Sequence, residues 1–564
     1  MLQTSRRDFV IRLASLAAVA GSGAALTACG GGDDAAPSFS YGVASGDPLA
    51  DRVMLWTHAQ YDGATDDVAL TWEVATDAAF TTLTASGSAR AVAAAAFTVK
   101  VDATGLNAGK DYFFRFRSGS HSSPVGRTRT LPAAGTASLS MAVMSCANYP
   151  AGYFNAYAEV TRTDARYAVH LGDFIYEYGA GGYASADAVA LGRVSDPANE
   201  CLSLSDYRKR YAQYRSDPDS KVFHAAMPVI AVWDDHEIAN DIYKDGAENH
   251  TESTEGKLAD RRAAALQAWH EWMPVRTPDA TDLRKIYRSF DFGGLTALHM
   301  LETRLLARDK PVEFAELLNP ATASAALATL SSTTRSLMGA TQLGWLQGQM
   351  AASNATWQVL GQQVLMARMS FPVSMLSALN PSDTSPSALA AGQQAITDYL
   401  IAKGTAATNP AALTDAQKAL LDPVKNPKLG YNLDAWDGYP VEREVLLTSA
   451  QKLGKKLVVL AGDTHNAWSS RLTLMDGSVV GQEFATPSIS SPGLEEYLAS
   501  LPPAEAQKIF LGAVDDLKYA DTARRGFLRM TFTPTEAKGT WHFVSTIKSR
   551  TYTVDASASQ SFSG

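Results

Sequence analysis

The sequence has few cysteines, no excess of basic residues and no convincing internal repeat, and these absences exclude several classes of protein. Three cysteines in 564 residues are too few for a disulfide framework. The formal net charge of −9 argues against nucleic-acid binding, because binding a phosphate backbone needs a cationic surface. Hydrophobic residues make up 46% and charged residues 19% of the chain, which excludes a disordered or fibrous protein. A chain of this length is predicted to contain a large core and more than one domain.

Residues 1–29 are predicted to be an export signal. The pair Arg6 and Arg7 precedes a short apolar stretch, whose length and weak hydrophobicity argue against a transmembrane anchor. The paired arginines resemble a twin-arginine signal, and an ordinary secretory signal is the alternative.

The end of this signal, Leu26-Thr27-Ala28-Cys29, resembles a bacterial lipobox. Cys29 is therefore expected to carry a lipid that anchors the mature protein to a membrane, in the periplasm or at the cell surface. Cleavage nearby, with loss of Cys29, is the alternative. Residues 30–37 begin with three glycines and are expected to form a flexible tether.

Residues 38–134 are predicted to form an all-β domain of the immunoglobulin or fibronectin III type. Short runs of β-forming residues at 53–56 and 70–74 are bounded by Gly, Asp and Pro. A turn then leads into the aromatic run at 112–117, a pattern typical of β-sandwiches. No cluster of metal-binding or acid–base residues occurs in this region, so a structural role is expected.

Residues 135–564 are predicted to form a layered α/β domain, because short apolar runs alternate with longer helical stretches. The apolar runs lie at 139–144, 167–171, 229–233, 295–301, 357–360 and 457–461. Stretches rich in Ala and Ser at 324–336 and 374–420 are expected to be surface helices and excursions.

Four polar clusters directly follow four of these apolar runs. They are Ser-Cys-Ala-Asn at 145–148, Gly-Asp-Phe-Ile-Tyr at 172–176, Asp-Asp-His-Glu at 234–237 and Gly-Asp-Thr-His-Asn at 462–466. Functional groups of layered α/β folds gather at the carboxyl ends of the strands. The clusters are therefore expected to converge, although hundreds of residues separate the first from the last.

The residue types in these clusters suit metal ions. Asp and Asn supply hard oxygen ligands, His supplies an imidazole, and Cys and Tyr bind as anions. Asp173 and Tyr176 are close enough to reach one ion, and an extended segment would place Asp463 and His465 on one side. So many anionic groups would repel one another unless cations neutralised them.

The order of the clusters resembles the calcineurin-like metallophosphoesterases, and the closer resemblance is to the PhoD-like family of alkaline phosphatases and phosphodiesterases. The residues that carry it are Gly-Asp-x-x-Tyr, Asp-His and Gly-Asp-x-His, with supporting motifs at 41–48, 434–440 and 484–489. The resemblance covers nearly all of the chain after the signal. Glu302 departs from it, because Asp is expected before Thr303 and Arg304, and its role stays open.

This resemblance implies a metallophosphoesterase β-sandwich core flanked by helices, with one Fe3+ and one or two Ca2+ ions. Cys146, Asp173, Tyr176 and His465 would hold the iron, with Asp173 bridging to a neighbouring ion. Asp235 stands where simpler metallophosphoesterases have an Asn ligand, and Asp234 and Asp463 would complete the oxygen-rich sites. Which carboxylate binds which ion stays open, and Asn240 is expected beside the ligands rather than among them.

The predicted function is that of an exported phosphatase that hydrolyses small phosphate mono- or diesters by a metal-activated hydroxide, in phosphate acquisition. His236 is assigned to the leaving-group side as general acid, with orientation of the carboxylates as its alternative role. Arg304 and Arg368 are candidates for phosphate contact on charge alone. The alternatives are a phosphodiesterase of phospholipase D type and a noncatalytic surface lipoprotein that binds metal or phosphate. A monomer is expected.

Overall fold

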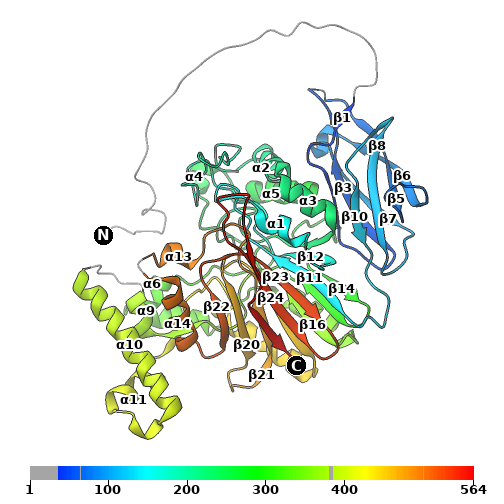
Figure 1. The fold of residues 1–564 in the computed structure, drawn as a ribbon. Helices are drawn as coiled ribbons and strands as arrows, with labels where there is room; N and C mark the ends of the chain where they lie inside the picture. The colour runs from blue at the N-terminus through cyan, green and yellow to red at the C-terminus, as the bar shows by residue number, and fades with distance from the viewer. Residues whose placement is uncertain (1–35, 64, 380–384, 500) are drawn as a thin grey trace. The chain divides into compact units, whose positions relative to one another are not determined.

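Two mixed β-sheets packed face to face form the core of the computed structural model (Figure 1). The structure describes residues 36–63, 65–379, 385–499 and 501–564. Arg6, Arg7, Cys29 and most of the predicted tether lie outside the described residues. Among the helices that are described, none has the length and apolar character needed to cross a membrane.

The first sheet has ten strands in the order β25-β24-β23-β11-β12-β13-β2-β3-β7, with β26 paired to β24. Its central strands β11, β12 and β13 are parallel. Its strands are β2 (Val43–Gly46), β3 (Arg52–His58), β7 (Thr98–Thr104), β11 (Leu139–Met144), β12 (Tyr167–His170), β13 (Pro228–Ala231), β23 (Arg525–Phe532), β24 (Ala537–Val544), β25 (Val554–Asp555) and β26 (Ser559–Phe562).

The second sheet has seven strands in the order β14-β15-β16-β19-β21-β20-β22. They are β14 (Arg288–Phe292), β15 (Thr296–Met300), β16 (Trp357–Gly361), β19 (Lys456–Ala461), β20 (Ala467–Thr473), β21 (Val479–Ala485) and β22 (Leu517–Asp521). On β19, Val458 and Leu460 belong to the core between the sheets, whereas Leu457 and Val459 pack under the outer helices. Burial on both faces explains why such strands are continuous apolar runs.

Helices cover the outer face of each sheet. α1 (Asn155–Val160), α2 (Leu204–Ser216), α3 (Pro218–Ala226) and α5 (Leu258–Trp272) lie together on the side of β11 and β12 (Figure 1). α8 (Gly339–Ala352), α12 (Pro440–Lys452) and α14 (Pro503–Ala513) pack on the seven-stranded sheet. The helical excursions predicted around 324–336 and 374–420 contain α7 (Ala323–Leu330), α9 (Val373–Leu379), α10 (Pro386–Thr408) and α11 (Asp415–Leu421).

The smaller elements complete the described chain. They are β1 (Pro37–Ser38) with β4 (Gln60–Tyr61), β17 (Ser370–Pro372) with β18 (Lys428–Gly430), α4 (Glu252–Glu255), α6 (Phe314–Leu318), α13 (Leu494–Tyr497), and the 3-10 turns η2 (Ala93–Ala95), η3 (Pro410–Ala412) and η4 (Trp436–Gly438). All six apolar runs identified in the sequence contain a strand, so the layered α/β class is confirmed. The strand in the third run ends at Ala231, two residues before the run does.

The N-terminal region is a β-sandwich that shares strands with the larger core. One layer is β10 (Gly126–Arg129), β8 (Asp111–Ser118), β5 (Val68–Ala75) and β6 (Leu83–Ala91), with β9 (His121–Ser122) beside β8. The other layer is β2, β3 and β7, and apolar residues of both layers form one core. β2 pairs in parallel with β13, so this layer continues the ten-stranded sheet. Gly46 is needed at the junction, because a Cβ there would overlap the carbonyl oxygens of Val229 and Pro274.

Candidate metal centre and active site

The four polar clusters converge at one edge of the two sheets. Three follow the neighbouring parallel strands β11, β12 and β13, and the fourth follows β19 of the opposite sheet. The Cys146 N–H donates to the Gly172 carbonyl at 3.2 Å, and a β-bridge joins Ser145 to Ser488 beyond the end of β21. The convergence expected from the order of runs and clusters is therefore present, because the strand ends meet at the same edge.

The backbone turns sharply where the clusters begin. Cys146, Asp173, Asp463 and His465 have φ values of 61°, 54°, 63° and 63°. Such left-handed conformations cost about 1–3 kcal/mol each in non-glycine residues and concentrate at functional sites. Asp463 and His465 therefore do not lie on an extended segment, contrary to the expectation from their spacing. At Gly172, with φ 108°, a Cβ would overlap Asp234, which explains the glycine of the Gly-Asp pair.

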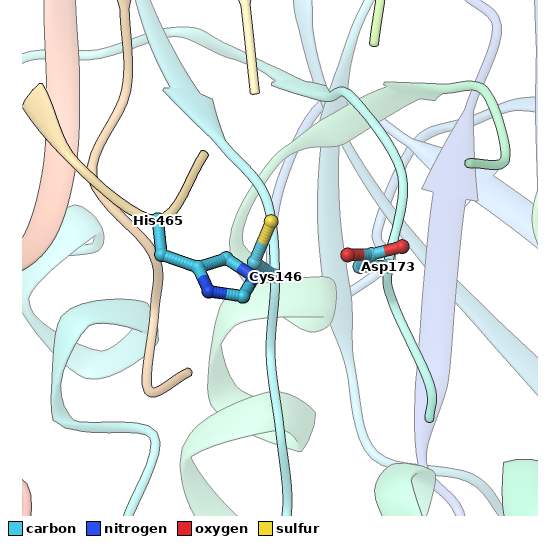
Figure 2. A group of neighbouring side chains, drawn as sticks. All are labelled: Cys146, Asp173 and His465. Carbon is cyan, nitrogen blue, oxygen red and sulfur yellow. The ribbon is translucent and has the colours of Figure 1, made fainter. Parts of the chain in front are cut away.

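The first potential ligand group contains Cys146, Asp173 and His465, whose ligand atoms all lie within 4.8 Å of one another. Figure 2 shows Cys146 with His465 on one side in the view and Asp173 on the other. The Tyr176 hydroxyl donates to Asp173 Oδ2 at 3.0 Å, lies 3.1 Å from His465 Nε2, and accepts from Ser491 Oγ at 2.6 Å. The four residues predicted to hold one ion thus come together. Burial, and then the Asp173 charge, raise the pKa of the Cys146 thiol well above its ordinary value.

Two further groups adjoin the first. They are Asp173, Asp235 and His236, and Asp234, Asp235 and Asp463. Asp173 Oδ1, Asp234 Oδ2 and Asp235 Oδ1 are buried without a hydrogen-bond partner in the described part of the chain. Burial raises the pKa of Asp234 to about 6 and that of Asp463 well above its usual range. Unpartnered buried carboxylate oxygens beside Cys, Tyr and His donors fit a set of bound cations.

Arg304 supplies positive charge from the protein itself. Its fully buried guanidinium donates to Asp234, to Asp434 Oδ2 at 2.7 Å and to Asp463 Oδ1 at 3.2 Å. Arg304 was a candidate for phosphate contact on charge alone, but its guanidinium is bound by these three carboxylates. The assignment to phosphate contact is therefore not supported. Asp434 was missed as a site residue, although it begins a motif that contributed to the family resemblance.

Glu302 and Arg368 are the other two residues whose roles the sequence left open. Both have roles away from the reaction. Glu302 accepts backbone N–H groups of Arg304, Leu305 and Leu306, so it holds the turn that presents Arg304. Arg368 donates to Thr473 Oγ1 at 2.6 Å. Thr473 is the last residue of β20, and Ala467, shortly after His465, is the first. The six residues between these ends correspond to roughly 20 Å along the strand. Arg368, a candidate for phosphate contact on charge alone, therefore lies away from the four polar clusters.

His236 is held by a carboxylate that the sequence analysis missed. Its Nδ1 lies 2.8 Å from Glu177 Oε2, while Glu177 Oε1 accepts from the Asn240 N–H and from Asn249 Nδ2, both at 2.9 Å. Burial opposes a proton on His236, but the charges of Asp235, Glu177 and Asp173 raise its pKa well above the ordinary value. The available signal was position, because Glu177 directly follows Tyr176.

Two neighbours complete the support of the site. Asn240 contacts Glu177 through its backbone N–H, and its side chain donates to Glu248. Its expected place beside the ligands therefore stays a prediction. Glu237 accepts the backbone N–H groups of Asp173, at 3.0 Å, and Asp234, at 2.8 Å. One buried carboxylate thus joins the loops after β12 and β13.

Comparisons with known proteins agree with this geometry. The family model for PhoD-like phosphatase matches residues 141–541, and the model for the N-terminal domain of PhoD-like phosphatase matches residues 25–132. Alkaline phosphatase D of Bacillus subtilis (strain 168) is 34% identical over 488 residues, which cover 82% of this chain and 71% of that protein. The solved structure of PhoD matches with a TM-score of 0.74 and 29% identity, covering 94% of this chain and 92% of that one.

These matches confirm the resemblance found in the sequence, the α/β class and the β-rich N-terminal region. They span both the sandwich and the region that carries the four polar clusters. The chain therefore belongs to the PhoD-like phosphatase family and is a phosphoric ester hydrolase of the alkaline phosphatase D type.

Proposed function

We propose that this phosphatase hydrolyses phosphate mono- and diesters at a centre of one Fe3+ and one or two Ca2+ ions, with His236 protonating the leaving group. The observation that carries the proposal is the place of His236. Its imidazole is fixed by Glu177 at 2.8 Å and belongs to a ligand group with Asp173 and Asp235. A general acid must lie beside the phosphoryl group, and this imidazole adjoins the carboxylates Asp173 and Asp235 that would hold the ions.

The donor set supports the choice of ions. Cys146, Tyr176 and His465 offer thiolate, phenolate and imidazole donors, which suit iron. Asp234, Asp235 and Asp463 offer the oxygen donors that suit calcium. Bound ions would acidify a water molecule and offset the charge of the phosphoryl oxygens.

The protein's own groups have separate tasks. Glu177 accepts the Nδ1–H of His236, which leaves Nε2 to donate a proton to the leaving-group oxygen. Arg304 offsets part of the charge of Asp234 and Asp463. Asp173, held at its N–H by Glu237, would bridge two ions, which is supported by its membership of two potential ligand groups.

The test pairs metal analysis of the purified protein with rates on matched phosphate monoesters and diesters. We expect iron and calcium in the protein and turnover of both ester types. A strong preference for phospholipid diesters would favour phospholipase D activity. Absence of turnover by metal-loaded protein would contradict catalysis and favour a binding protein.

We also propose that the protein is exported by the twin-arginine route, anchored through Cys29 and active as a monomer in phosphate acquisition. The supporting residues are Arg6, Arg7 and the lipobox-like 26–29 segment. Mass spectrometry of the mature N-terminus tests the anchor, and an unacylated N-terminus beyond Cys29 would contradict it. Light scattering tests the monomer.

A further inference from the structure

Two tyrosines that are only partly buried flank the imidazoles of the candidate active site. The Tyr178 ring centroid lies 5.4 Å from that of His236, and the Tyr183 ring centroid lies 6.4 Å from that of His465. The two tyrosine rings are 5.8 Å apart. They come from the segment that follows β12, directly after the Gly-Asp-x-x-Tyr motif. The function proposed above makes no use of either ring.

The partly exposed side chains around the site are of two chemical kinds. Asp241, Asp434 and Asp463 are carboxylates, whereas Tyr178 and Tyr183 are aromatic. His236 packs against aromatic side chains, because its ring also lies 4.2 Å from the Tyr176 ring, centroid to centroid.

The place of the general acid fixes where the leaving group lies. A proton donor must come within about 2.6–3.2 Å of the oxygen that it protonates. If His236 protonates the leaving-group oxygen, the carbon atoms attached to that oxygen lie next to the His236 ring, within reach of the neighbouring Tyr178 ring.

Tyr178 is available to contact the leaving group, whereas Tyr183 is held in place by other residues of the site. The Tyr183 hydroxyl lies 3.4 Å from His465 Nδ1 and donates to the Pro492 carbonyl at 3.4 Å, and its ring stacks on Tyr176 at an interplanar angle of 27°. Within the described residues, the Tyr178 hydroxyl makes no hydrogen bond, and the aromatic rings that its own ring contacts are those of Tyr183 and His236.

We propose that the Tyr178 ring is a platform for the leaving group and selects phosphate esters whose alcohol part is a flat aromatic ring, as in aryl or nucleoside esters. The inference rests on the proposed function, because it uses His236 as the general acid. Aromatic rings gain from stacking beyond the area that they bury, and an aliphatic ring of similar size does not.

The test compares benzyl phosphate with cyclohexylmethyl phosphate, two alkyl monoesters of similar size whose alcohols differ mainly in the flatness of the ring. The wild-type enzyme should favour benzyl phosphate about three- to tenfold in kcat/KM. Tyr178→Leu should bring this ratio close to one, and Tyr178→Phe, which keeps the ring, should preserve it. Tyr287→Leu is the matched control, since Tyr287 is a partly exposed tyrosine that packs on Trp345 instead; it should keep the wild-type ratio.

Three results would overturn the inference. They are equal rates on the two esters in the wild-type enzyme, an unchanged ratio in Tyr178→Leu, and loss of the ratio in Tyr178→Phe. If Tyr178→Leu does not fold, Tyr178→Met replaces it, with the same ratio expected. Turnover of both esters at equal rates leaves the proposed function intact, whereas no turnover of either ester by metal-loaded enzyme removes both proposals.

Discussion

His236 Nδ1 lies 2.8 Å from Oε2 of Glu177, and the Glu177 side chain is completely buried. The second carboxylate oxygen is held by Asn249 Nδ2 and by the Asn240 N–H. A buried acceptor that is itself fixed allows the imidazole one orientation and places the proton of Nδ1 toward Glu177. Under the proposed function, Nε2 is then the nitrogen that donates a proton to the leaving group.

The first prediction concerns Glu177. Glu177→Gln keeps a hydrogen-bond acceptor but removes the charge that stabilises protonated His236, so kcat/KM should fall about 10- to 100-fold. The loss should be larger for alkyl phosphates than for activated aryl phosphates. Glu200→Gln is the control, because Glu200 also accepts from Asn249 but does not contact His236. Equal losses for both ester types would assign Glu177 to folding rather than to proton donation.

Removal of the imidazole itself should have a greater effect. Loss of a general acid costs about a hundredfold to ten-thousandfold in rate, so His236→Ala should lower kcat in that range for alkyl phosphates. Activated aryl phosphates need less protonation of the leaving oxygen and should lose less. A series of esters with leaving groups of graded acidity measures this. A uniform loss over the series would show that His236 only orients Asp235 and its neighbours.

The third prediction concerns the charge balance at Arg304. Arg304→Met removes the buried cation that pairs with Asp234, Asp434 and Asp463, which leaves buried carboxylates without compensation. Metal-free protein should lose about 3–5 kcal/mol of unfolding free energy, measured by urea denaturation. Added Ca2+ should recover part of the loss. Arg368→Met, whose arginine pairs with no carboxylate in the described chain, is the control and should change stability little. Equal stability of Arg304→Met and Arg368→Met would contradict the role of Arg304 in balancing the buried carboxylate charges.

The sequence predicts which candidate ligands come together better than it predicts the groups that support them, for a physical reason. Cys146, Asp173 and His465 each follow an apolar strand, so the adjoining edges of the two sheets bring them together whatever their distance along the chain. Glu177 and Glu237 act by accepting particular N–H groups, and such contacts depend on the loop conformation. The left-handed backbone at Asp463 likewise leaves no periodic pattern in the sequence, so the expectation of an extended segment was wrong.

The two arginines show the same limit. Arg304 and Arg368 look alike in the sequence, yet one is buried among carboxylates and the other lies at the far end of β20. Charge alone does not give position. The shared strands of the N-terminal sandwich were also unforeseen, since the two residue pairs that join β2 to β13 connect segments about 180 residues apart.

The fourth prediction concerns calcium. Asp234, Asp235 and Asp463 form a group of hard oxygen donors in which two oxygens accept no hydrogen bond from the described residues. A Ca2+-selective chelator should abolish activity, and added Ca2+ should restore it, because flexible carboxylate sites bind this ion reversibly. Iron content, measured in the same samples, should not change. Full activity after exhaustive chelation would contradict a functional calcium site.

The last prediction uses the two buried cysteines of the described chain as a matched pair. Cys146 belongs to a ligand group, whereas Cys201 belongs to none. A thiolate and a phenolate on Fe3+ should give charge-transfer colour, because both are electron-rich anions on an oxidising ion. Cys146→Ala should lose iron, colour and most activity, since it removes an anionic ligand. Cys146→Asp should keep part of each with an altered spectrum, and Tyr176→Phe should weaken the colour. Cys201→Ser should change neither colour nor rate. Full iron content and turnover in Cys146→Ala would show that the PhoD-like fold is present with a different metal site.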